Sequence, residues 1–206
     1  MITLDKAPGG LWLVTIARAE KANSLTAAML TELLHIAEAA ADEARALVLT
    51  GAGNKVFSAG ADLDEARNGL TVDPIWERLS GAIASLPIPT IAALNGTCAG
   101  GAFGMMLACD MRLTVPHASF FYPVAKLGYL PQPSDPGRMR ALIGLGRSKL
   151  ILLAAEKIGA EEALDWGLVD RIVLPEALMA AAKSLLATAL AGERETMSQI
   201  KALVDG

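Results

Sequence analysis

The clearest pattern in the chain is an apolar repeat of three to four residues in its first quarter. A repeat of this length places apolar side chains on one helix face, so we predict an amphipathic helix over Thr26–Glu43, capped by Ser24 or Thr26. The apolar runs Leu11–Ala17 and Arg45–Thr50 flank it and are predicted strands. Because Arg45–Thr50 is apolar without alternation, we expect it to be buried on both faces of a parallel sheet.

The same patterns continue along the rest of the chain. They predict further helices over Pro74–Leu86, Gly137–Ile143, Leu150–Glu156, Ala160–Trp166, Pro175–Leu190 and Arg194–Val204. They also predict strands over Pro89–Leu94, Met111–Val115, Ala118–Phe121 and Leu168–Leu174, and a loop over the Gly- and Pro-rich Lys126–Gly137. Because strands alternate with helices, we predict an α/β fold with a mostly parallel, layered sheet.

A stretch of small residues follows the predicted strand Pro89–Leu94. Asn95-Gly96 ends that strand, and Gly100–Gly104 opens a helix that is apolar on nearly every face. The first N–H groups of a helix have no partner within it, and glycine leaves them accessible to a ligand. Two interpretations stay open with equal weight: a backbone-lined site for an anion or oxyanion, or a tightly packed junction of strand and helix.

A second turn of small residues, Phe57–Leu63, follows the predicted strand Arg45–Thr50 and a Gly-rich loop. Asp62 stands at the expected start of a helix, and we interpret it as a helix cap in preference to a catalytic group. The chain therefore has two small-residue turns, each of which follows a buried strand.

Composition and charge narrow the class of protein. The 206 residues are 53% hydrophobic, the mean hydropathy is +0.41 and the net charge is −4. The length indicates one domain, and the absence of a basic cluster argues against a nucleic-acid partner. No apolar run reaches the length of a membrane span, and the first residues do not resemble a secretion signal, so we expect a cytoplasmic protein.

The reactive side chains are few. Two cysteines, Cys98 and Cys109, are expected to remain thiols in a reducing compartment. With only two histidines and no Cys-x-x-Cys spacing, the sequence predicts no metal site.

Several segments match the motifs of one family in order and spacing. They are Arg18–Leu25, which ends in Asn23-Ser24-Leu25, Phe57–Leu63 (FSAGADL), and Asn95–Asp110, which contains Gly100-Gly101 and ends in Ala108-Cys109-Asp110. Gly146-Arg147-Ser148 and Glu161–Asp170 match two later landmarks. Together they resemble the enoyl-CoA hydratase/isomerase (crotonase) family over nearly the whole chain.

The resemblance implies a ββα spiral, assembly as a homotrimer or a dimer of trimers, and an acyl-CoA thioester as substrate, with no permanently bound cofactor. It also implies an oxyanion hole of two backbone N–H groups, carried over by position to Ala59 and Gly101. Such donors stabilise the negative charge that forms on a thioester carbonyl oxygen. The oxyanion interpretation of both small-residue turns agrees with this.

The resemblance further places the substrate and its CoA moiety near one set of residues. These are Lys21, Ala22, Leu25, Ala61, Asp62, Leu63, Gly100, Pro123, Val124 and Tyr129. Lys21 is a candidate partner for a phosphate, and the simpler interpretation is a solvated lysine in an exposed loop.

The chain departs from the family at the two positions where hydratases commonly carry glutamates. Gly104 and Val124 occupy those positions, and neither side chain can transfer a proton. Asp135 aligns with a loop position where some members carry a catalytic aspartate, which makes it the candidate acid or base. The alternative is a helix cap before Pro136. Tyr122 and Tyr129 are further candidate proton donors, although packing roles are expected for both.

The chain ends about one helical pair after the Trp166–Val173 landmark, which predicts a more open CoA site or altered subunit contacts. We therefore expect a crotonase-like core over residues 1–174 and a short C-terminal helical segment over residues 175–206. The leading hypothesis is isomerisation or hydration of an enoyl-CoA through a thioester enolate, without the usual glutamate pair. The alternatives are an acyl-CoA hydrolase and a catalytically inactive CoA-binding or assembly protein.

Overall fold

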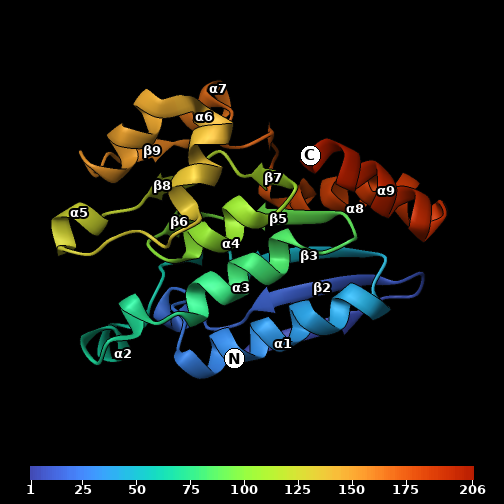
Figure 1. The fold of residues 1–206 in the computed structure, drawn as a ribbon, viewed down its shortest axis with the longest axis horizontal. Helices are drawn as coiled ribbons and strands as arrows, with labels where there is room; N and C mark the ends of the chain where they lie inside the picture. Colours follow the sequence, from blue (N-terminus) through green and yellow to red (C-terminus); the bar gives the residue numbers. More distant parts are fainter.

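The computed structural model describes all residues from 1 to 206 and contains two sheets and nine α-helices (Figure 1). The larger sheet has the strand order β1-β2-β3-β5-β7-β10. Its strands span Ile2–Lys6, Leu11–Ile16, Ala46–Gly51, Thr90–Leu94, Met111–Thr114 and Arg171–Ile172, respectively. Only β1 runs antiparallel to its neighbour, so the expectation of a mostly parallel sheet is confirmed.

The two central strands show why the sequence pattern located this sheet. Every residue of β3 and of β5 is buried, as expected for parallel strands that are covered on both faces. Helices α1 and α3 lie side by side over the front of the sheet in Figure 1, and α8 contacts β3, β5 and β7. One core cluster of 52 buried residues extends from β1 to α8.

The smaller sheet consists of short strands that the sequence analysis largely missed. It has the order β4-β6-β8-β9, and the strands span Val56–Ser58, Thr97–Ala99, Ser119–Phe121 and Ile158–Gly159. The first three are parallel, and β4 and β6 each end at a small-residue turn. This sheet therefore places the two turns next to each other.

The helices complete the layers. They are α1 (Ala27–Glu43), α2 (Leu63–Arg67), α3 (Ile75–Ala84), α4 (Ala102–Ala108), α5 (Val124–Leu127), α6 (Asp135–Leu152), α7 (Ala160–Trp166), α8 (Leu178–Ala191) and α9 (Arg194–Asp205). Three 3₁₀ turns, η1, η2 and η3, span Ala19–Lys21, Leu70–Val72 and Pro175–Ala177. The predicted cap of α1 is confirmed, because the Thr26 hydroxyl accepts a hydrogen bond from the Met29 N–H at 3.2 Å.

Some predicted elements were wrong in their bounds. The predicted loop over Lys126–Gly137 includes the end of α5 and the start of α6. Two helices were predicted in the region of α6, and α6 is indeed interrupted at the non-helical Gly144, but its second part ends at Leu152 and not at the predicted Glu156. The predicted strand Leu168–Leu174 shrinks to the two residues of β10. No helix of the structure combines the length and the apolar character needed to cross a membrane.

Candidate active site

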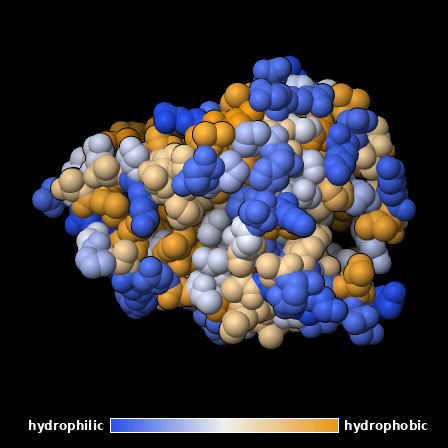
Figure 2. Space-filling view, turned by 180° about the vertical axis from the view of Figure 1, so that it is seen from behind, coloured by the Kyte–Doolittle hydropathy of each residue, from blue (hydrophilic) through white to orange (hydrophobic).

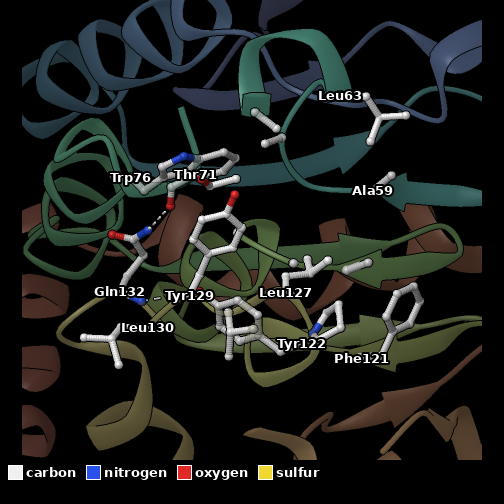
Figure 3. A pocket seen from close by; sticks show the side chains of 17 residues that line it. Ala59, Leu63, Thr71, Trp76, Phe121, Tyr122, Leu127, Tyr129, Leu130 and Gln132 are labelled. Carbon is white, nitrogen blue, oxygen red and sulfur yellow. Dashed lines mark hydrogen bonds between the residues drawn. The ribbon is translucent and has the colours of Figure 1, made fainter. Parts of the chain in front are cut away.

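A pocket of about 720 Å³, measured with its open mouth, lies where the two small-residue turns meet the segment that follows β8 (Figure 3). Seventeen residues line it and 12 of them are hydrophobic. None carries a charged side chain. Seen from behind, a hollow opens at the right edge of the molecule, on the side where Figure 1 places α2 and α5 (Figure 2).

The two turns touch each other at Gly60. This residue has φ +87°, a conformation that favours glycine. A Cβ atom on Gly60 would lie 2.9 Å from the Ala99 carbonyl oxygen and 3.2 Å from the Gly101 nitrogen. Glycine at this position thus allows the backbone of the first turn to approach that of the second.

The first turn offers one N–H group without a partner. The Ala59 N–H donates to the Ala22 carbonyl at 3.0 Å, and the Gly60 N–H donates to the Ser58 hydroxyl at 3.2 Å. The Ala61 N–H has no acceptor within the chain. The assignment of Ala59 as an oxyanion donor was therefore wrong, because its N–H is already bound. Ala61 is the donor that this turn presents.

Leu25 explains why the Ala61 N–H stays free. The Leu25 N–H donates to the Gly60 carbonyl, and the Leu25 carbonyl accepts from the Asp62 N–H, both at 2.8 Å. This short parallel bridge holds the backbone on each side of Ala61 and leaves the Ala61 N–H unused. Ala61 also lines the pocket.

The second turn offers a matching group. The Gly100 N–H donates to the Phe121 carbonyl at 3.1 Å, whereas the Gly101 N–H has no acceptor within the chain. Gly101 lines the pocket at the start of α4, as the sequence analysis expected. A Cβ atom on Gly101 would lie 3.0 Å from the Trp76 ring, so this indole packs directly beside the free N–H.

Asp135 does not line the pocket. Its side chain is fully buried, its Oδ2 atom accepts a hydrogen bond from the Tyr122 hydroxyl at 2.9 Å, and its Oδ1 atom has no partner. Burial raises the pKa of the carboxyl to about 6, although the Tyr122 hydrogen bond acts in the opposite direction. The cap interpretation was wrong, because Ser134 holds the cap position and Asp135 is the first residue of α6.

The Asp135 carboxyl occupies the space beside the missing glutamate. A Cβ atom on Gly104 would lie 3.1 Å from Asp135 Oδ1, a tight contact that would require the carboxyl to shift slightly. Val124, at the other expected glutamate position, lines the pocket. No group of three or more His, Cys, Asp or Glu side chains is arranged to hold a metal ion.

Tyr122 stands between Asp135 and the pocket. It lines the pocket, its ring stacks on Phe103 with a centroid distance of 5.3 Å, and its hydroxyl points to Asp135. Burial raises the pKa of this hydroxyl above its usual range. Asp135 can therefore act on a bound ligand only through Tyr122.

Four of the predicted ligand contacts lie outside the lining of this pocket: Lys21, Ala22, Leu25 and Asp62. Asp62 caps α2 by accepting from the Asp64 N–H at 3.0 Å, which confirms the cap interpretation, and it pairs with Arg18 at 2.8 Å. The Arg18 hydrogen bond holds the pKa of the Asp62 carboxyl below its usual range. Like the exposed Lys21 and the buried Leu25, Asp62 does not line the pocket.

Other predicted contacts do line the pocket. They are Ala59, Ala61, Leu63, Gly100, Gly101, Pro123, Val124 and Tyr129. The sequence analysis missed Thr71, Trp76 and Gln132, which come from η2, α3 and the segment before α6. The apolar pattern of α3 identified Trp76 only as a buried residue, and no motif indicated Thr71 or Gln132.

The family model for enoyl-CoA hydratase/isomerase matches residues 6–205 of the chain. The chain belongs to the enoyl-CoA hydratase/isomerase family. A probable enoyl-CoA hydratase from Rhodobacter capsulatus is 39% identical over 165 residues, which are 78% of this chain and 64% of that protein. A short-chain-enoyl-CoA hydratase from Clostridium acetobutylicum is 35% identical over 191 residues, which are 89% of this chain and 73% of that protein.

Solved structures of the enoyl-CoA hydratase/isomerase family share the fold. The crystal structure of an enoyl-CoA hydratase from Bacillus anthracis matches with a TM-score of 0.92 at 31% identity. The match covers 100% of this chain and 82% of that one. The predicted crotonase-like α/β fold is confirmed by this match.

Proposed function

We propose that this enzyme binds an acyl-CoA thioester with its carbonyl oxygen between the N–H groups of Ala61 and Gly101. The observation that carries the proposal is that these two N–H groups have no acceptor within the chain, belong to turns in direct contact, and line the same pocket. Polar groups that lack a partner in a largely apolar pocket are the expected anchors for a ligand.

The chemistry of a thioester fits such a pair of donors. Removal of a proton beside the carbonyl, or attack on the conjugated double bond, places negative charge on the carbonyl oxygen. Donors that already point to this oxygen stabilise the charge, and each contributes on the order of 3 kcal/mol to lowering the barrier. Isomerisation and hydration of an enoyl-CoA both pass through a state that carries this negative charge on the carbonyl oxygen.

We assign the transfer of the substrate proton to the Tyr122–Asp135 pair. With a pKa of about 6, Asp135 is ionised at neutral pH and accepts the Tyr122 hydrogen bond at 2.9 Å. Because burial raises the pKa of the Tyr122 hydroxyl, its proton would pass to Asp135 only as Tyr122 gains another proton. Tyr122 would take a proton from the substrate as it gives its own to Asp135, and the reverse step would return it. Asp135 is then a positioning and proton-accepting residue behind Tyr122.

The substitution Ala61→Pro tests the oxyanion assignment, because it removes the free N–H and no hydrogen bond within the chain. We expect turnover of an enoyl-CoA to fall about 10²- to 10³-fold. The matched control Ala61→Gly keeps the N–H and should retain most of the activity. Circular dichroism of both variants checks that they fold. Full activity in a folded Ala61→Pro variant would contradict the assignment.

A second candidate function is acyl-CoA binding without turnover. The observation that favours it is that no charged side chain lines the pocket. Calorimetry combined with mass spectrometry of the products, over a panel of 2-enoyl- and 3-enoyl-CoA thioesters, separates the candidates. A rearranged or hydrated thioester supports the enzyme, free CoA indicates a hydrolase, and binding without any product supports the second candidate.

A further inference from the structure

We propose that the part of the pocket beyond Trp76 binds an uncharged aromatic acyl group that carries a hydroxyl at its far end. This inference rests on the proposed function, because it takes the carbonyl of the same acyl group to lie between the N–H groups of Ala61 and Gly101.

Aromatic side chains are concentrated around the pocket. The chain is only 4% aromatic, yet both of its tyrosines, one of its three tryptophans and one of its four phenylalanines line this pocket. These residues are Trp76, Phe121, Tyr122 and Tyr129. Ring faces and edges interact favourably with another ring beyond the burial of apolar area, so such a lining favours a flat ligand over a flexible chain.

Two of these rings are held in place by hydrogen bonds. The Trp76 Nε1–H donates to the Leu70 carbonyl at 2.8 Å, and the Tyr122 hydroxyl donates to Asp135. Trp76 also packs beside Gly101, so it adjoins the proposed position of the thioester carbonyl. Side chains fixed before a ligand arrives lose little conformational freedom on binding, which favours a rigid acyl group.

Polar groups gather at one end of the pocket. Figure 3 shows Thr71, Trp76 and Gln132 on the side opposite Leu63, with the Tyr129 hydroxyl directed toward Thr71. The Gln132 amide donates to the Thr71 carbonyl at 3.4 Å. The hydrogen bonds of Gln132 to the Thr71 carbonyl and to the Tyr122 hydroxyl involve neither the Thr71 hydroxyl nor the Tyr129 hydroxyl, which have no partner within the chain.

The hydroxyls of Thr71 and Tyr129 determine which ligand groups can bind at the end of the pocket opposite Leu63. A hydroxyl both donates and accepts, so the hydroxyls of Thr71 and Tyr129 can bind a hydroxyl on the ligand. The lining holds no charged side chain, and a buried charge without a partner is unfavourable. The acyl group that fits is therefore neutral.

The test compares three thioesters that lack an enoyl double bond, so that isomerisation and hydration cannot alter them. 3-Phenylpropanoyl-CoA and nonanoyl-CoA have acyl groups with equal numbers of carbon atoms, and 3-(4-hydroxyphenyl)propanoyl-CoA adds the hydroxyl. Calorimetry on the full chain should give the lowest Kd for the hydroxylated ligand and the highest for nonanoyl-CoA, with roughly twofold to tenfold between successive ligands.

The variants Tyr129→Phe and Thr71→Val remove the protein hydroxyls one at a time. We expect at least one of them to abolish the advantage of the hydroxylated ligand while the Kd of 3-phenylpropanoyl-CoA changes less. Nonanoyl-CoA binding as tightly as 3-phenylpropanoyl-CoA would overturn the inference, as would a hydroxyl advantage that is absent or survives both variants. Butyryl-CoA is the control for the proposed function, which fails if neither it nor any other thioester binds.

Discussion

At the scale of single residues, a buried carboxyl lies beside Gly104, one of the two positions where the family resemblance leads one to expect a glutamate. Gly104 leaves room that the Asp135 carboxyl fills, and a Cβ atom on Gly104 would lie only 3.1 Å from it. This carboxyl belongs to α6, whereas Gly104 belongs to α4, and it accepts the hydrogen bond of Tyr122, which lines the pocket. A side chain at Gly104 would therefore require the Asp135 carboxyl to shift by a few tenths of an ångström.

The buried carboxyl should give the protein a distinctive pH dependence of stability. The pKa of Asp135 is about 6 in the folded state, against an ordinary 3.8, so the folded chain binds more protons than the unfolded chain in this window. The contribution of Asp135 to the unfolding free energy should therefore fall as pH rises from about 4 to about 6, by up to about 3 kcal/mol in total.

Urea unfolding of Asp135→Asn against the unsubstituted chain measures this contribution. The variant lacks the titrating group, so its stability relative to the unsubstituted chain should rise with pH across that window. Asp64→Asn is the matched control, because the Asp64 side chain is 88% exposed. An identical pH dependence in the Asp135→Asn variant and the unsubstituted chain would show that the carboxyl is not perturbed.

At the scale of elements, α6 bends at a single glycine. Gly144 has φ +77° and ψ 172° inside the helix, a conformation that an alanine adopts only with strain. The sequence analysis separated this region into two helices with different bounds. The change of direction at Gly144 joins the helical part that carries Asp135 to a second helical part, and α6 as a whole contacts both α4 and α7.

Two alanine substitutions within α6 should have opposite effects. Gly144→Ala should lower the unfolding free energy by about 1–2 kcal/mol because it forces an alanine into the left-handed region. Gly146→Ala, two residues away in the helical conformation with open space around it, should raise it by about 0.5–1 kcal/mol. Thermal unfolding of both variants checks the signs, and a stabilised Gly144→Ala would argue against the bend.

Long, strongly patterned elements were predictable, and short ones were not. Helix α1 buries one face, which gives its sequence a helical period, and β3 is buried along its whole length, which gives an unbroken apolar run. Both patterns are visible in the sequence. Strands β4, β6 and β9 have two or three residues, too few for a period to be visible. Their positions depend on pairing with distant segments.

The sequence predicted which turns form the candidate site, but it did not predict which backbone N–H group of the first turn is free. The motifs located both small-residue turns, and Gly101 was identified as a residue that now has a free N–H. The choice of Ala59 over Ala61 was wrong because the bridge to Leu25, which decides which N–H is free, joins segments far apart in the chain. The same holds for Trp76, whose contact with Gly101 no local pattern records.

At the scale of the whole molecule, the site exists because two sheets bring distant segments together. The lining residues range from Ala59 to Gln132, and they come from α2, η2, α3, β6, β8, α5 and the connections between elements, including the turn after β4. The smaller sheet sets the two turns side by side, and the helical layer of α3 and α4 places Trp76 against them. Under the proposed function, stabilisation of charge would depend on the fold that joins the two turns, whereas proton transfer would depend on the buried Tyr122–Asp135 pair.

The central claim is tested most directly by a crystal structure of the protein with butyryl-CoA, a saturated thioester that isomerisation and hydration cannot alter. We predict that the thioester oxygen lies about 2.7–3.1 Å from the nitrogens of both Ala61 and Gly101. A thioester carbonyl that contacts neither nitrogen, or that binds the N–H of only one turn, would contradict the account.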